Sequence, residues 1–394
     1  MTRSEPSWED GVRAAVSDLP RVLGDTGAGG SGPVLVSVGG LHGNETSGVL
    51  ALQRVFARLA ENRTGLVGRL VGWTGNRAAL AAGCRYLDQD LNRVWLRDVL
   101  DGMDADGTTG VREVEEVREI LREYDELASL PRGRLALLDL HSTSGGGSAF
   151  TNLDDTLINR ELAFAIPVPH VLGLEEEVAG TLVGYFNEQG RAAIGFEAGQ
   201  HLDPESVDRA EAAVWLCMEA AGVLARGERA EVAEARALLV DQHRASPHVV
   251  EVRHRHPVGS DDGFDMSPGF RNFQEIDEGQ LLARDRSGPL TAPMNGLILM
   301  PLYQGQGDDG YFIVRRVHAA WLGVSAVLRK LRFDSLLHWL PGVQRAEGRR
   351  RKTFVVDLHR ARVLALQIFH LLGYKRVGRT ETQLIMRKRD LWAH

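Results

Sequence analysis

The chain has 394 residues, of which 43% are hydrophobic and 25% are charged. This length favours two or three domains, and the composition excludes a largely disordered or fibrous chain. Two cysteines, Cys84 and Cys217, exclude a disulfide framework and a cysteine-rich zinc module. The first ten residues are polar and no stretch of about 18 apolar residues occurs, so we expect a cytoplasmic protein without a signal peptide or membrane span.

Apolar runs alternate with helical patterns in the first part of the chain, as far as Ala225. The sequence predicts strands at 33–40, 68–73, 134–140 and 192–196, and helices at 47–59, 111–127 and 205–225. This alternation predicts an α/β fold with a mixed, mostly parallel sheet flanked by helices. Ligands of such sheets bind beyond the carboxyl ends of strands, so the loops after Gly40, Leu140 and Phe196 are the candidate positions.

The pattern of apolar residues changes in the second half of the sequence. Short β-like runs at 249–252, 297–301 and 311–314 predict a smaller β-domain, and the part from 319 onward predicts helices at 321–331 and 359–372 and a hairpin at 374–387. We therefore expect three parts: an α/β domain that carries the site (1–240), a small β-domain that caps the site (241–318) and a basic α+β C-terminal extension (319–394).

The net charge of −7 is unevenly distributed. From position 319 onward 16 Lys and Arg accompany 5 Asp and Glu, whereas the chain before that position holds 30 and 48. The extension, whose densest cluster is Arg349-Arg350-Arg351-Lys352, could bind nucleic acid phosphates or anionic lipid. No nucleic-acid motif accompanies it, so docking on the acidic part of the chain or a subunit contact is favoured.

Two short motifs at predicted strand ends suggest a metal site. His42 and Glu45, three residues apart at a strand-to-helix turn, can converge on one point, and His141 at a neighbouring strand end supplies a third ligand. Two histidines and a glutamate with an open fourth position are typical of catalytic zinc. Asp139 shares a strand face with His141 and is expected to orient it. An isolated His-x-x-Glu is more often a surface helix start, but its coincidence with the second motif favours metal.

Arginines and asparagines gather between the two motifs, in Gly75-Asn76-Arg77 and in 85–93. Guanidinium groups bind carboxylates bidentately and stay charged, so this segment is suited to hold an acidic substrate. The alternative is a solvated basic loop paired with Asp88 and Asp90, and the residue types alone do not decide between the two.

Taken together, the motifs resemble the succinylglutamate desuccinylase/aspartoacylase family, which is related to the zinc carboxypeptidases. The shared motifs are His42-Gly43-Asn44-Glu45, Asn76, Arg85-Tyr86-Leu87-Asp88-Gln89-Asp90-Leu91-Asn92-Arg93, Asp139-Leu140-His141 and Glu197-Ala198-Gly199. The resemblance covers roughly positions 30–318, and the string between the two metal motifs is its most specific part.

The resemblance implies one Zn²⁺ per subunit, held by His42, Glu45 and His141. Glu197 would be the general base that takes a proton from water and hands it to the leaving amine. Arg85 would polarise the scissile carbonyl and stabilise the oxyanion.

The resemblance also implies how the substrate binds. Asn92 and Arg93 would bind a carboxylate of the amino-acid half, and Tyr303 would reach back from the β-domain to close the pocket. The loop 142–147 departs from that of aspartoacylases, so neither acetyl-aspartate nor succinyl-glutamate is assigned.

The function that follows is zinc-dependent hydrolysis of the amide bond of a small N-acyl amino acid, a linear amide. One alternative is a zinc carboxypeptidase that acts on short peptides. Another is a non-catalytic metal-binding protein whose basic tail binds a polyanion. We expect no membrane partner, do not favour nucleic acid, and leave a homo-oligomer open.

Overall fold

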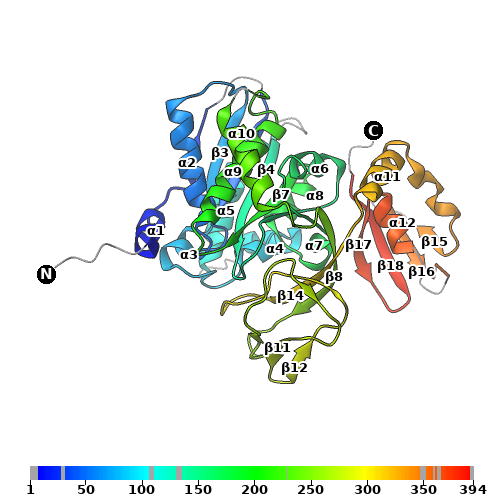
Figure 1. Cartoon of the computed structure of the whole chain (residues 1–394). Helices are drawn as coiled ribbons and strands as arrows, with labels where there is room; N and C mark the ends of the chain where they lie inside the picture. The colour runs from blue at the N-terminus through cyan, green and yellow to red at the C-terminus, as the bar shows by residue number, and fades with distance from the viewer. Residues whose placement is uncertain are drawn as a thin grey trace.

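A computed structural model describes residues 8–27, 32–105, 111–129, 135–227, 229–346, 352–357, 360–361 and 365–390. Within these residues the main sheet has 11 strands in the order β1-β3-β2-β4-β7-β5-β6-β8-β14-β13-β10 (Figure 1). Its strands are β1 (Val22–Asp25), β2 (Val34–Gly39), β3 (Arg69–Thr74), β4 (Leu135–Thr143), β5 (Phe150–Leu153), β6 (His170–Leu172), β7 (Ala192–Gln200), β8 (Val249–Pro257), β10 (Glu275–Ile276), β13 (Gly296–Leu299) and β14 (Asp309–Arg316).

Helices accompany the first eight strands of the sheet in chain order. They are α1 (Trp8–Val16), α2 (Ser47–Glu61), α3 (Arg77–Ala82), α4 (Arg97–Ala105), α5 (Arg112–Ala128), α6 (Leu157–Ala163), α7 (Leu174–Glu177), α8 (Leu182–Glu188), α9 (Glu205–Ala220) and α10 (Ala230–Gln242), with a short 3-10 turn at Leu91–Arg93. In the described part of the chain, no helix combines the length and apolar character needed to cross a membrane.

The centre of the sheet is parallel and buried on both faces. Strands β3, β2, β4 and β7 run in one direction, and every residue of β2 and β4 is buried. Leu35 of β2 packs with α2 and α9 on one face, whereas its neighbours Val34 and Val36 pack with α5 and α8 on the other. Burial on both faces explains why these strands read as continuous apolar runs, and it confirms the expected α/β fold.

The strands of the expected β-domain continue the main sheet. Strand β8 pairs in parallel with β6, and β14, β13 and β10 follow it antiparallel. A separate three-stranded sheet of β9 (Asp265–Met266), β11 (Leu281–Asp285) and β12 (Gly288–Thr291) lies beyond them, at the bottom of Figure 1. The predicted runs at 249–252, 297–301 and 311–314 are strands, but they are hydrogen-bonded into the large sheet.

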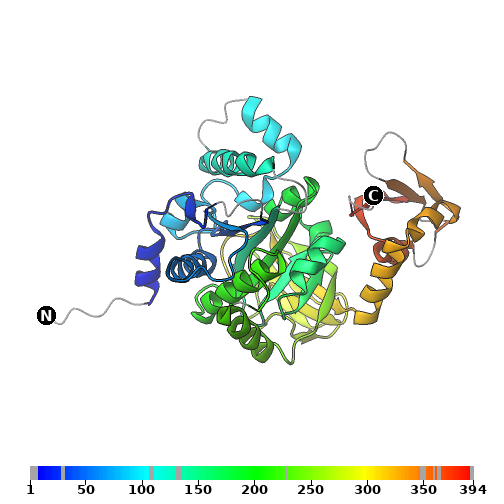
Figure 2. The same cartoon turned by 90° about the horizontal axis from the view of Figure 1, so that it is seen from above.

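The C-terminal extension is an α+β unit beside the body, and both views show it on one side of the molecule (Figures 1 and 2). Its elements are α11 (Ala319–Lys330), a 3-10 turn (Phe333–Trp339), β15 (Val343–Arg345), β16 (Thr353–Asp357), α12 (Ala365–Leu371), β17 (Tyr374–Arg379) and β18 (Gln383–Lys388). The predicted hairpin is β17–β18, and β15 and β16 were not predicted. Arg349, Arg350 and Arg351 lie outside the described residues, as do positions 359 and 362–364 of the helix predicted at 359–372.

Buried ion pairs join the extension to the body. Asp154, just after β5, lies 2.6 Å from Nζ of Lys375 and 2.7 Å from Nη1 of Arg389. Asp155 lies 2.6 Å from Nη2 of Arg329. Burial acts to raise the pKa of Asp154, but Lys375 and Arg389 outweigh it and hold this pKa below its usual range. The expectation that the basic extension docks on the acidic body is confirmed.

Candidate active site

The strand register brings the predicted site residues to one edge of the sheet. His42 follows the end of β2, and Glu45 lies in the turn that leads into α2. His141 lies near the end of β4, directly beside Glu197 of the neighbouring parallel strand β7. Because parallel strands end at the same edge, loops and strand ends far apart in sequence meet there.

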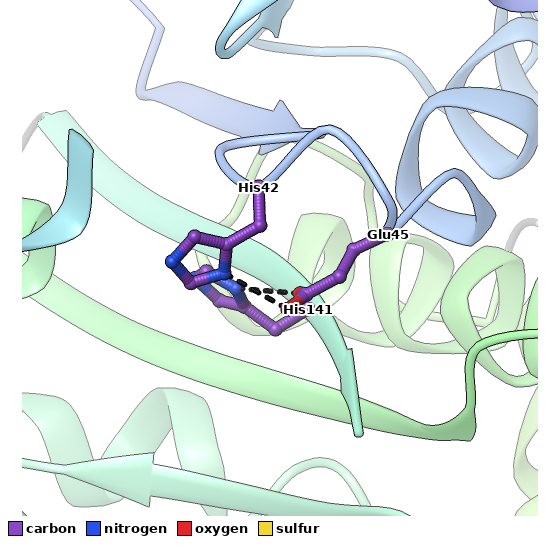
Figure 3. A group of neighbouring side chains, drawn as sticks. All are labelled: His42, Glu45 and His141. Atoms are coloured by element: carbon purple, nitrogen blue, oxygen red, sulfur yellow. Dashed lines mark hydrogen bonds and ion pairs between the residues drawn. The ribbon is translucent and has the colours of Figure 1, made fainter. Parts of the chain in front are cut away.

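The ring nitrogens of His42 and His141 converge on the Glu45 carboxylate (Figure 3). Nδ1 of His42 lies 2.9 Å from Oε1 of Glu45, and Nδ1 of His141 lies 2.9 Å from Oε2. One ligand atom from each of the three buried residues lies within 4.8 Å of the others. This spacing allows the three side chains to share a single metal ion.

Each histidine turns its other ring nitrogen to an aspartate. Nε2 of His42 lies 3.0 Å from Oδ1 of Asp90, and Nε2 of His141 lies 2.9 Å from Oδ2 of Asp139. A carboxylate on the far nitrogen fixes the ring orientation and directs the Nδ1 lone pair toward the metal. The second contact was expected from the Asp139-x-His141 spacing. The role of Asp90 was missed, because its partner is distant in the sequence.

The electrostatics of this cluster favour charged forms. Burial acts to raise the pKa of Glu45, yet His42 and His141 hold it well below its usual range. Burial also acts to lower the pKa of His141, but Asp139 and Glu45 raise it well above its usual value. Glu45 is therefore a carboxylate, the form that a metal ligand must have, whereas His141 must release a proton when a metal binds.

Glu197 has a different environment. Burial raises its pKa to about 8, and although His141 and Arg85 oppose this, Glu45 and Asp139 add to it. Its Oε2 atom is buried and has no hydrogen-bond partner among the described residues. The structure thus places beside the histidine–glutamate cluster a carboxyl oxygen that no described side chain or backbone group hydrogen-bonds.

Residues 85–93 bring an arginine to the same cluster. Nη1 of Arg85 lies 3.3 Å from Oε1 of Glu45, and Nη2 lies 3.0 Å from Oδ2 of Asp90. Burial acts to lower the pKa of Arg85, but Asp90 and Glu45 outweigh it and raise the pKa. Asp90 pairs with Arg85 as the alternative interpretation expects, but this pair is buried, and Asp88 pairs on the surface with Arg112, outside the segment.

The backbone between the candidate ligands His42 and Glu45 is closely packed against neighbouring segments. Gly43 donates its N–H to the carbonyl oxygen of Arg85 at 3.0 Å. A Cβ at this position would lie 2.1 Å from the backbone carbon of Ala79 in α3. Only glycine fits, so this residue holds the ligand turn against the 85–93 segment.

A cavity of about 520 Å³ opens over the cluster. It is lined by all but one of the predicted site residues, namely His42, Glu45, Arg85, Asn92, Arg93, His141 and Glu197. Asn92 also lies near the cluster, with Nδ2 3.4 Å from Nε2 of His141. Arg93 pairs with Asp309 of β14 at 3.1 Å, which links the 85–93 segment to the second half of the chain.

Tyr303 is the exception. Its hydroxyl donates to the Ser267 carbonyl at 2.8 Å and accepts from the Phe270 N–H at 2.9 Å, so it closes a loop away from the cavity. The neighbouring Gln304 lines the cavity instead and accepts from Asn44 at 2.7 Å. The structure does not bring Tyr303 to the site.

His201 also lines the cavity. Its Nδ1 lies 2.8 Å from Oγ of Ser142, and its Nε2 lies 3.0 Å from Oε1 of Gln304. From the sequence, the position of His201 soon after Glu197 indicates that it could line the pocket, with a helix-capping or surface role as the alternative.

The segment that carries these motifs is similar to known proteins. Residues 31–220 match the family described as Succinylglutamate desuccinylase/Aspartoacylase catalytic domain. A succinylglutamate desuccinylase of Burkholderia lata is 37% identical over 106 residues, which cover 24% of this chain and 30% of the relative. A probable aspartoacylase of Prochlorococcus marinus is 30% identical over 210 residues, covering 50% of this chain and 64% of the relative. The chain thus spans less than two thirds of the length of either relative.

Solved structures share the fold. The product-bound ectoine utilization protein of Ruegeria pomeroyi aligns with a TM-score of 0.52 at 21% identity, covering 72% of this chain and 85% of that one. This likeness supports the α/β architecture.

Proposed function

We propose that the chain is a zinc-dependent hydrolase of the amide bond in N-acyl amino acids, because residues 31–220 match the succinylglutamate desuccinylase/aspartoacylase family. The observation that carries this proposal is the convergence of two Nδ1 atoms on the Glu45 carboxylate, beside the Glu197 oxygen that lacks a partner among the described residues. We further propose that it acts in the cytoplasm.

The donor set fits a catalytic zinc. His42, Glu45 and His141 would hold the ion, and the aspartates behind both histidines orient the rings for it. When bound, zinc supplies a Lewis acid that polarises a carbonyl and makes water nucleophilic at neutral pH.

The other side chains supply proton transfer and binding. A bound cation would favour the carboxylate form of Glu197, which then accepts a proton from the attacking water and donates it to the departing nitrogen. Arg85 stays charged and stabilises the oxyanion that forms on the scissile carbonyl. Asn92 and Arg93, which line the same cavity, bind the carboxylate of the amino-acid half.

Zinc content and turnover test the proposal. Purified protein should hold one zinc per chain and hydrolyse members of a panel of N-acetyl and N-succinyl amino acids. Glu197→Gln should keep its zinc and lose about 10²–10⁴-fold in kcat, the usual contribution of a general base. The matched control is Glu275→Gln, which removes an exposed carboxylate on β10.

Two results would contradict the proposal. One is equal turnover by metal-free protein, and the other is no turnover of any panel member by zinc-loaded protein. Release of C-terminal residues from short peptides instead would favour the carboxypeptidase alternative.

A further inference from the structure

The cavity over the histidine–glutamate cluster continues to the C-terminal extension. Besides the site residues, it is lined by Arg376, Arg379 and neighbouring residues of β17 and by Arg387 of β18. The extension begins at Ala319, well beyond the 31–220 segment that matches the family. This end of the cavity is therefore built by a part of the chain outside that match.

Helix α8 connects the two ends of the cavity. At its start, the Leu182 N–H donates to Oδ1 of Asn92 at 2.9 Å. At its last residue, Glu188 accepts from Nη2 of Arg387 at 2.9 Å. Its seven residues correspond to roughly 10 Å of helix. Side chains of this helix, including Val183 and Tyr185, line the cavity along the way.

The extension is held firmly enough to serve as a wall. Lys375 of β17 forms a buried ion pair with Asp154, and Arg389, just after β18, forms another. Arg376 pairs with Glu177 of α7. These contacts lie at the open end of the β17–β18 hairpin, where Lys375 is the register partner of Arg387, and Arg387 itself pairs with Glu188 of α8, so this end of the hairpin is fixed to the body.

The three arginines of this wall differ in their ion-pair partners. Arg376 and Arg387 each face a glutamate of the body, whereas Arg379 is exposed and has no ion-pair partner among the described residues. An arginine at a cavity wall with its charge uncompensated is suited to bind a carboxylate. Arg387, on the adjacent strand, adds further guanidinium donors.

We propose that Arg379, with Arg387, forms a distal anion subsite that selects N-acyl amino acids whose side chain is long and ends in a carboxylate. This inference rests on the proposed function, which places the α-carboxylate of the substrate at Asn92 and Arg93. A side chain that runs from there along α8 reaches the extension with its terminal group. The cavity then binds two anionic groups of one substrate, one at Asn92 and Arg93 and the other at the extension.

Three compounds test the subsite. Nα-acetyl-Nε-succinyl-lysine carries the distal carboxylate, Nα-acetyl-Nε-succinamoyl-lysine replaces it with a neutral amide of the same shape, and N-acetylalanine lacks the long side chain. Release of acetate from the first should exceed that from the second about tenfold in kcat/KM, the ratio that one charge-assisted hydrogen bond supplies. The difference should lie mainly in KM.

Substitutions of Arg379 test whether this residue causes the preference for the distal carboxylate. Arg379→Gln should abolish the tenfold preference and leave turnover of N-acetylalanine unchanged, while Arg379→Lys should retain part of it. The matched control is Arg345→Gln, which removes an exposed arginine of β15 in the same sheet, away from the cavity. A preference that survives Arg379→Gln, or that disappears in Arg345→Gln, overturns the proposal.

Binding of the deacylated products separates this inference from the proposed function. Calorimetry should give a Kd for Nε-succinyl-lysine about tenfold below that for Nε-succinamoyl-lysine, and Arg379→Gln should equalise the two. Equal affinities in the unaltered protein overturn the subsite even if N-acetylalanine is hydrolysed. A tenfold difference without turnover of any acetyl compound supports the subsite and counts against the hydrolase.

Discussion

The side-chain amide of Asn76 donates a hydrogen bond to the buried carboxylate of Glu113, with Nδ2 3.1 Å from Oε1. The same carboxylate accepts from the backbone N–H groups of Leu87, at 2.7 Å, and of Asp88 and Gln89, at 3.1 and 3.3 Å. Glu113 lies on α5, so one helix holds the segment that carries Arg85, Asn92 and Arg93. Glu113 therefore positions the site residues through the backbone of the 85–93 segment.

Glu113→Gln should therefore weaken both stability and activity. The variant places an N–H₂ group against backbone donors, and an unsatisfied buried donor costs about 1–3 kcal/mol. We expect a lower thermal midpoint and a reduced kcat/KM with zinc content unchanged. Glu115→Gln, at an exposed position of the same helix, is the control and should match the unaltered protein in all three measurements. Unchanged kcat/KM in Glu113→Gln would contradict the positioning role.

Asp139→Asn tests the carboxylate behind His141. The substitution preserves shape but removes the charge that lies 2.9 Å from Nε2 of that histidine. Loss of such a partner typically lowers metal affinity about 10–100-fold. Competition with a zinc chelator measures the change, with Asp208→Asn, a surface carboxylate of α9, as the control. An affinity equal to that of the unaltered protein would show that Asp139 does not tune the site.

Asp154→Asn should loosen the C-terminal extension. The change leaves Lys375 buried without its carboxylate partner, and breaking a buried pair in this way costs about 3–5 kcal/mol, whereas Arg389 keeps Glu175 and Glu176. Limited proteolysis should cut the segment around 317–319 faster, and the thermal midpoint should fall. Removal of the exposed pair between Arg54 and Asp208 by Asp208→Asn should cost at most about 1 kcal/mol. Equal protease resistance of both variants would argue against an ionic lock.

His370 makes the docking pH-dependent. Burial acts to lower its pKa, but contacts with Glu176 and Glu251 outweigh this and raise the pKa to about 9. A histidine whose folded pKa exceeds its unfolded value of about 6.5 contributes stability that is complete below pH 6.5 and is lost as the pH rises through 9. The contribution is roughly 3 kcal/mol, because each unit between the folded and unfolded pKa corresponds to about 1.4 kcal/mol.

The thermal midpoint of the unaltered protein should therefore fall more steeply between pH 6.5 and 10 than that of His370→Gln. Comparing the two proteins isolates the histidine, because other titrating groups act equally in both. Parallel curves for the two proteins would exclude His370 as the source of the pH dependence.

The sequence predicted those parts of the molecule that depend on local spacing. Strands β2, β4 and β7 are buried on both faces, so they appear as apolar runs, and the residues at their ends are the site. His42 and Glu45 are three residues apart, and Asp139 and His141 share one strand face, so local geometry was sufficient to group each pair. The long helices α2, α5 and α9 were also predicted, because their apolar faces repeat with the helical period.

The short strands and the direction of individual side chains could not be predicted from the sequence. Strands β5, β6, β15 and β16 have at most five residues, too few for a periodic pattern. Tyr303 and Gln304 are adjacent, but the backbone turns the first toward Ser267 and the second into the cavity. Which of two neighbours faces a site is decided by the path of the chain, which residue types do not reveal.

By itself, the sequence determined the three metal-ligand candidates, the general-base candidate, the α/β sheet and the opposite charges of the body and the extension. Only the tertiary structure decided that Asp90 orients His42 from a distant part of the sequence, that β8 joins the main sheet, and that Arg379 lies on a wall of the same cavity as Glu197. The physical reason is the sequence separation over which the interactions act. Helical and strand periods, burial patterns and charge are properties of near neighbours, so the sequence shows them directly. Strand order and the docking of one unit on another depend on the summed packing of the whole chain.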